Sequence, residues 1–110
     1  MKIIYFRQQS GREPVRDYIC ALSKKDAAQV LAALADIEEH GLDNTVINLK
    51  PIDGKLWEIK LSAHRIFYVV LTGPMMVLLH AFKKEGQKTP LKDRELAKKR
   101  MKLVLGGENA

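Results

Sequence analysis

The fold is decided by residues 56–83, which read LWEIKLSAHRIFYVVLTGPMMVLLHAFK. Three runs of β-branched, aromatic and aliphatic residues in this stretch have the composition of β-strands: they lie at 56–61, 64–71 and 75–83. Short turns at Ser62-Ala63 and Thr72-Gly73-Pro74 separate the runs, and turns this short join neighbouring antiparallel strands. The stretch therefore predicts a three-stranded antiparallel meander.

The residues before the meander predict one strand followed by two helices. Residues 2–6 are β-branched and aromatic, which is typical of a short strand. Pro14 suits the first turn of a helix over 13–22, and Ser23 is the expected N-cap of a second helix over 24–40. The apolar stripe of the second helix comprises Ala27, Val30, Leu31, Leu34 and Ile37. Two helices joined so closely are typical of a helical hairpin.

The remaining segments complete a small α+β fold. An extended stretch is expected at 46–50, and Thr89-Pro90 begins a final helix that runs to about residue 104, where Gly106-Gly107 ends it. The predicted order is β-α-α-β-β-β-α, with a mainly antiparallel four-stranded sheet, the helical hairpin on one face and a C-terminal helix. We expect a single domain over 1–105 and a flexible tail over 106–110.

Composition excludes several classes of protein. A chain of 110 residues that is 46% hydrophobic and 29% charged is expected to bury one modest core rather than stay disordered. Its one cysteine, Cys20, cannot form an intramolecular disulfide, which favours a reducing compartment. The longest apolar run, at 75–82, is too short to span a membrane, and no signal-peptide pattern is present at the start. These features predict a cytoplasmic protein.

Positive charge is concentrated in the second half of the chain. The net charge is +6 and the pI is about 9.6. Residues 1–49 carry six basic and seven acidic side chains, whereas residues 50–102 carry thirteen basic and five acidic ones. Such a surplus favours a polyanionic partner, either a nucleic acid or an acidic protein. A generally solvated cationic face is the alternative interpretation.

A polar cluster on the meander is the candidate site. Glu58 and Lys60 share one face of their strand, and Arg65 can join them from the next strand. Cleavage of RNA without a metal needs a base for the ribose 2′-hydroxyl, cations for the phosphorane, and an acid for the 5′-oxygen. Arginine and lysine suit the phosphate. The histidines and Cys20 show no metal-ligand spacing and no phosphate-binding loop is present, so we expect no cofactor. Ordinary cross-strand neighbours are the alternative.

Four blocks of sequence carry a resemblance to a known family. They are GKLWEIK at 54–60, HRIFY at 64–68, LLHAFKK at 78–84, and QKTP with ELAKKR within 87–100. In this order and spacing they resemble the phage-derived, HigB-like branch of the RelE/ParE toxin superfamily over nearly the whole chain. The resemblance implies a RelE-like fold and a type II toxin that cleaves mRNA in the ribosomal A site, as a metal-independent endoribonuclease. It also implies two kinds of partner, a helix-turn-helix antitoxin and the mRNA-bearing ribosome.

The resemblance also implies roles for individual residues. Lys60 and Arg65 match two cations that the nucleases of the family present to RNA, and Lys84 matches a third, as lysine in place of arginine. Glu58 stands where the family has another lysine. The late tyrosine of the family falls near Pro90, where this sequence has none, so proton transfer is left to Glu58 or to a nearby lysine. The expected catalytic residues are Glu58, Lys60, Arg65 and Lys84, and the expected RNA-binding residues are Lys55, Lys83 and Lys88.

Two other functions stay open at this point. A ParE-like protein shares the fold but inhibits DNA gyrase and does not cleave RNA, so it would block supercoiling while leaving mRNA intact. A non-catalytic nucleic-acid-binding module would bind RNA or DNA with a steep salt dependence and would not arrest growth.

Overall fold

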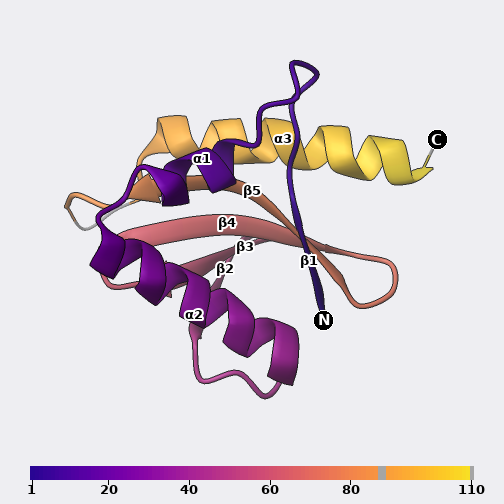
Figure 1. The fold of residues 1–110 in the computed structure, drawn as a ribbon. Helices are drawn as coiled ribbons and strands as arrows, with labels where there is room; N and C mark the ends of the chain where they lie inside the picture. The colour runs from indigo at the N-terminus through magenta and orange to yellow at the C-terminus, as the bar shows by residue number, and fades with distance from the viewer. Residues whose placement is uncertain (87–88, 110) are drawn as a thin grey trace.

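The computed structural model describes residues 1–86 and 89–109, with side chains described through residue 106. Its sheet lies between α3 on one face and the α1–α2 pair on the other (Figure 1). The elements are β1 (Lys2–Tyr5), α1 (Pro14–Cys20), α2 (Lys24–His40), β2 (Asn48–Asp53), β3 (Leu56–Leu61), β4 (His64–Leu71), β5 (Met75–Lys83) and α3 (Leu91–Asn109).

The sheet is open and mixed, with the strand order β1-β5-β4-β3-β2. Strands β2 to β5 pair in antiparallel fashion, and β1 joins the edge of β5 in parallel. The predicted meander is confirmed, and its three strands have the predicted bounds. Its turns contain backbone with positive φ, at Ser62 (56°) and Gly73 (79°), which tightens the chain reversals between the strands.

The described part of the chain has five strands, so the prediction of a four-stranded sheet is wrong. The additional strand, β2, overlaps the extended stretch expected at 46–50 but continues to Asp53. Proline lacks the N–H that a central strand needs, and Pro51 lies in an edge strand, where one side has no neighbour. The pairing with β3 shifts register between Pro51 and Asp53, which accommodates the proline.

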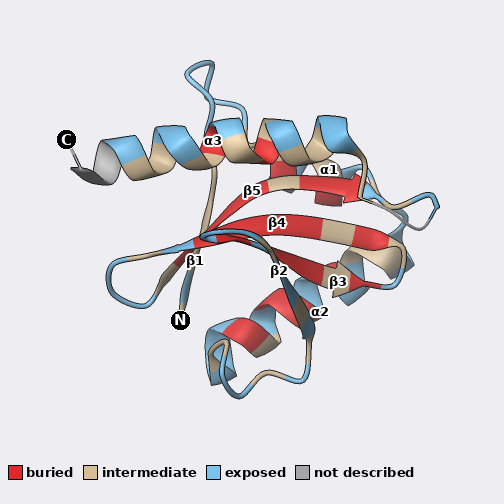
Figure 2. Ribbon diagram, turned by 180° about the vertical axis from the view of Figure 1, so that it is seen from behind, coloured by how far each residue is buried: buried red, intermediate tan, exposed pale blue. Residues whose placement is uncertain are grey.

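Two apolar clusters cover the two faces of the sheet. One face of the sheet packs against α1 and α2, and we call it the hairpin face. The other packs against α3, and we call it the α3 face. On α2 the buried residues are Val30, Ala33, Leu34 and Ile37, which follow the helical repeat, while Leu31 is half exposed beside that stripe. Figure 2 shows that burial is concentrated in the central strands, with more exposed edge strands. The central strands therefore provide a rigid base for polar side chains near their ends.

Helix α3 continues to Asn109, so the prediction that Gly106-Gly107 ends it is wrong. Gly106 does not adopt the positive φ that a glycine C-cap uses, and the helix continues through it. Ala97 is fully buried, and Met101, Val104 and Leu105 also pack on the sheet, which holds the helix in place. None of the described helices has the length and apolar character needed to cross a lipid bilayer.

Candidate functional site

Strand alternation brings three predicted side chains together on the α3 face. Lys60 and Arg65 are direct partners across β3 and β4, and Glu58 pairs with Phe67 one step further along the same face. Thr89, just before α3, reaches this group through Glu58. We call Glu58, Lys60, Arg65 and Thr89 the Arg65 site. The expectation that the first three share one face is confirmed by the register.

The backbone holds the Arg65 guanidinium in a fixed position. Its Nη1 donates to the carbonyl oxygens of Ser62, at 2.6 Å, and His64, at 3.0 Å. Its Nε lies 3.5 Å from Glu58 Oε1, yet the Nε–H is buried and has no hydrogen-bond partner among the described residues. Two backbone acceptors and the nearby carboxylate therefore fix the guanidinium, while its buried Nε–H is out of reach of an external anion.

Glu58 is the buried member of the site. Its side chain is 1% exposed, against 12% for its partner Arg65. Thr89 Oγ1 donates to Glu58 Oε2 over a long 3.5 Å. A buried carboxylate requires a compensating charge, and Arg65 supplies it. Lys60, by contrast, is only half-buried and forms no ion pair with any residue that the structure describes. The site therefore combines a held guanidinium with an uncommitted ammonium.

The remaining predicted lysines are distributed unevenly around this site. The Lys84 N–H donates to the Ala63 carbonyl at 2.7 Å, which extends the β5 ladder beside the Arg65 end of the sheet. Lys83 pairs with His64 and so belongs to the opposite face. Lys55 precedes β3, roughly 17 Å from Lys60 at about 3.3 Å per residue. Lys88 lies outside the described residues.

A histidine network ties α3 to β5 on the same face. His80 Nε2 lies 2.7 Å from Asp93 Oδ1, and Arg100 Nη1 lies 3.4 Å from His80 Nδ1 and donates to the Leu79 carbonyl at 2.9 Å. Burial lowers the pKa of His80; Asp93 opposes this shift and the Arg100 charge adds to it. The neutral ring then donates from Nε2 and accepts at Nδ1. Sequence spacing carries no signal for this network, because its members are far apart along the chain.

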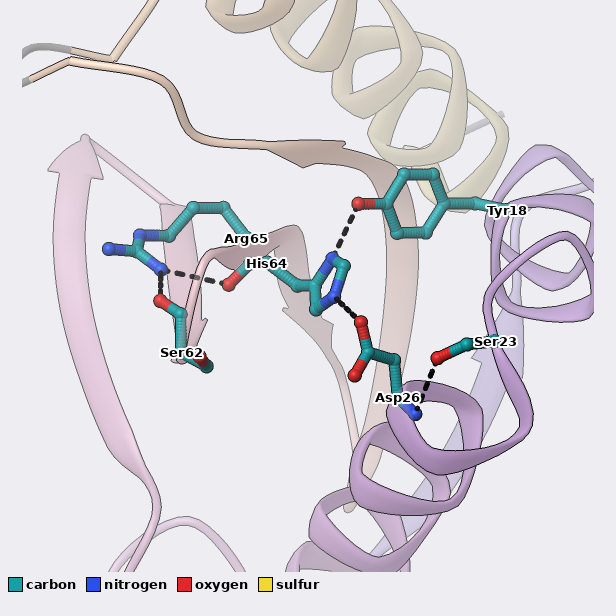
Figure 3. Close-up of polar contacts among 6 residues, drawn as sticks. All are labelled: Tyr18, Ser23, Asp26, Ser62, His64 and Arg65. Atoms are coloured by element: carbon teal, nitrogen blue, oxygen red, sulfur yellow. Dashed lines mark hydrogen bonds and ion pairs between the residues drawn. The ribbon is translucent and has the colours of Figure 1, made fainter.

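A second histidine network lies on the hairpin face. Figure 3 shows His64 and its neighbour Arg65 pointing away from each other. The Tyr18 hydroxyl lies 2.7 Å from His64 Nδ1, and His64 Nε2 lies 3.1 Å from Asp26 Oδ2. Burial, with help from the Asp26 charge, raises the pKa of Tyr18, so the phenol stays protonated and donates. Ser23 Oγ accepts from the Asp26 N–H at 3.2 Å, which confirms the predicted N-cap.

This second network ties α1 and α2 to the start of β4. Because the His64 carbonyl also accepts from Arg65, the helical hairpin supports the residue that positions the guanidinium. Across residues 1–86 and 89–109, no group of three or more histidine, cysteine, aspartate and glutamate side chains is placed to hold a metal ion. The chemistry that the Arg65 site itself offers is electrostatic: it can bind a phosphate and stabilise negative charge.

Comparison with known proteins places the sequence in a family. A search of curated proteins returns no relative that matches the chain. Residues 17–102, which cover most of the chain from α1 into α3, match the family described as phage-derived protein Gp49-like (DUF891). This family is linked to toxin–antitoxin modules. The chain therefore belongs to the phage-derived Gp49-like family.

Proposed function

We propose that the chain is the toxin of a type II toxin–antitoxin system and that it cleaves mRNA in the ribosomal A site, with the Arg65 site as its catalytic centre. Membership of the Gp49-like family supports the toxin assignment. The basic surplus over residues 50–102 supports a polyanionic substrate. The observation that carries the nuclease assignment is the pairing of Lys60 with a backbone-held Arg65.

The proposed reaction is attack by a ribose 2′-oxygen on the adjacent phosphorus. The 2′-oxygen loses its proton as its bond to phosphorus forms. The bond to the 5′-oxygen breaks, which leaves a 2′,3′-cyclic phosphate and a 5′-hydroxyl. Negative charge builds up on the phosphorane oxygens between these two events, and fixed cations accelerate such a step. Arg65 and Lys60 supply those cations on one face of the sheet.

The burial of Glu58 favours a positioning role over a role as base. The carboxylate is 1% exposed and faces the Arg65 Nε, so it fixes the plane of the guanidinium instead of meeting a ribose. We assign protonation of the leaving 5′-oxygen to the ammonium of Lys84, which follows the strand end next to the site. Solvent then accepts the 2′-hydroxyl proton. The cleavage rate is therefore expected to rise with pH, and the pH–rate profile is expected to lack the inflection that ionisation of a carboxylate base would produce.

The test uses purified protein with a defined mRNA, either free or bound to programmed ribosomes. We expect cuts in the ribosome-bound message, mapped by primer extension, and fragments that a kinase labels directly because they carry 5′-hydroxyl groups. Replacing Lys60 with Gln is expected to slow cleavage by roughly 100-fold or more, since it removes one cation aimed at the phosphorane. The matched control is Lys102→Gln, at an exposed lysine on α3.

Arg65 needs a more careful variant, because Arg65→Ala would leave Glu58 buried without a charge partner. The double variant Arg65→Met with Glu58→Gln removes both charges together, and Arg12→Ala, at an exposed surface arginine, controls for the lost positive charge. Full cleavage by the folded double variant would refute the assignment of this site. Intact RNA in both reactions, with inhibited supercoiling by gyrase, would replace nuclease activity with gyrase inhibition.

A further inference from the structure

A large apolar groove lies between β1 and α3, away from the Arg65 site. It has a volume of about 980 Å³. One wall is formed by the end of β1 and the segment that follows it, residues 4–10, and the other by α3 between Leu96 and Val104. Leu71 and Val77 form the sheet side of the groove. The groove therefore opens on the edge of the sheet where β1 is the last strand.

The groove presents apolar side chains to solvent. Leu103 is 63% exposed although it lies on the helix face that borders the groove. Ile4 and Phe6 are partly buried on the opposite wall. An exposed leucine beside a concave apolar surface is typical of a binding site, because removing such a side chain from water is favourable.

The charges around the groove have a single sign. Arg7, Lys99 and Arg100 line it, and none of its described lining residues is acidic. The Arg100 guanidinium carbon lies 5.5 Å from the centre of the Phe6 ring, so this cation bridges the two walls. The complementary ligand is a segment with apolar side chains and carboxylates beside them.

We propose that this groove is the docking site for an acidic, apolar segment of the antitoxin. The inference rests on the toxin part of the proposed function and not on RNA cleavage. RNA fits the groove less well: the cations at its rim suit phosphates, but a charged backbone gains nothing from the apolar floor formed by Leu71 and Val77. A second copy of the chain also fits less well, because it carries the same net charge of +6.

Binding can be tested with the full chain and short synthetic peptides. The first peptide is an amphipathic helix of leucine and glutamate. The second has lysine for every glutamate, and the third has serine for every leucine. We expect the first peptide alone to shift the backbone amide signals of residues 4–10 and 96–104 in ¹⁵N-labelled protein.

Two pairs of variants test the apolar and the charged contacts separately. Leu103→Asp is expected to weaken binding by at least about tenfold, whereas Leu91→Asp, at a similarly exposed leucine of α3 outside the groove, leaves it unchanged. Lys99→Glu is expected to weaken binding of the acidic peptide, and Lys102→Glu, on the same helix but outside the groove, provides the control.

Several results would overturn the inference. They are the absence of binding, equal binding of the basic peptide, signal shifts centred on the Arg65 site, displacement of the peptide by oligouridine, and self-association that Leu103→Asp abolishes. Cleavage of RNA by the same preparations is measured in parallel. A protein that binds the acidic peptide in the groove but leaves RNA intact would support the docking site and refute only the nuclease. A protein that cleaves RNA but does not bind the peptide would support the nuclease and refute the docking site.

Discussion

Replacing Glu58 with Gln removes the charge partner of Arg65 while keeping the shape of the side chain. Removing one member of a buried ion pair typically costs about 3–5 kcal/mol of stability. Two features of the structure reduce this figure: Arg65 Nη1 keeps its two carbonyl acceptors, and Arg65 is 12% exposed. We therefore expect Glu58→Gln to lower the free energy of unfolding by about 2–3 kcal/mol.

Urea denaturation measures this loss directly. With a urea m-value of roughly 1–3 kcal/mol/M, the midpoint is expected to fall by about 0.7–3 M without a change in slope. Glu95→Gln, which neutralises an exposed glutamate on α3, is expected to stay within about 0.5 kcal/mol of the wild type. A double-mutant cycle with Arg65→Met should give a coupling energy of about 1–3 kcal/mol. A Glu58→Gln protein as stable as the control, or a cycle without coupling, would refute the reasoning.

The same variant separates the two possible roles of Glu58 in RNA cleavage. A positioning carboxylate holds Arg65, so its loss lowers the rate at every pH and leaves the shape of the pH profile unchanged. A general base would give the wild type an acidic limb that Glu58→Gln removes. Single-turnover rates across a pH series therefore decide between the roles. An acidic limb of the pH–rate profile that is present in the wild type and absent in the variant would show that Glu58 is the general base.

Three further predictions concern the histidine networks and the core. Because folding lowers the pKa of His80 below 6.5, the protein loses stability as the pH falls below 6.5, and Asp93→Asn steepens that loss; urea midpoints across the pH range test it. Tyr18→Phe leaves His64 Nδ1 without its donor and should lower the free energy of unfolding by about 1–2 kcal/mol, so a variant as stable as wild type contradicts the network. Burial raises the pKa of Tyr68 to about 12, so ultraviolet titration of the folded protein should show its phenolate only near that pH. The Tyr68→Phe variant should lack this late absorbance change, which assigns the change to Tyr68.

The sequence predicts the meander well because its signals are local. Alternating side chains mark each strand, and turn residues separate the strands at the places where the structure reverses. Strand β2 is harder to predict, because Pro51 lowers strand propensity and only the edge position makes it acceptable. On α2, hydrophobicity favours the large Leu31 over Ala33 as a core residue. The structure instead buries Ala33 and leaves Leu31 half exposed.

The candidate site is predictable only in part. Alternation is enough to place Glu58, Lys60 and Arg65 on one face. The burial of Glu58 depends on Thr89 and on the packing of α3, which are tertiary features. The contact between His80 and Asp93 also depends on how α3 crosses the sheet, so neither residue stands out in the sequence. Contacts between residues distant in the chain leave no periodic pattern from which they could be inferred.

The groove and the Arg65 site lie apart, so an antitoxin that binds the groove does not thereby inhibit the site. Leu71 lines the groove and lies on β4 six residues beyond Arg65, which is roughly 20 Å at about 3.4 Å per residue. A segment seated in the groove therefore does not touch Arg65. Neutralising the proposed nuclease would require a partner that continues along α3 to the site, or one that shifts α3 and so loosens the His80–Asp93 contact. Anchoring in the groove and inhibition at Arg65 are then separate functions of one partner, each with its own set of contacts.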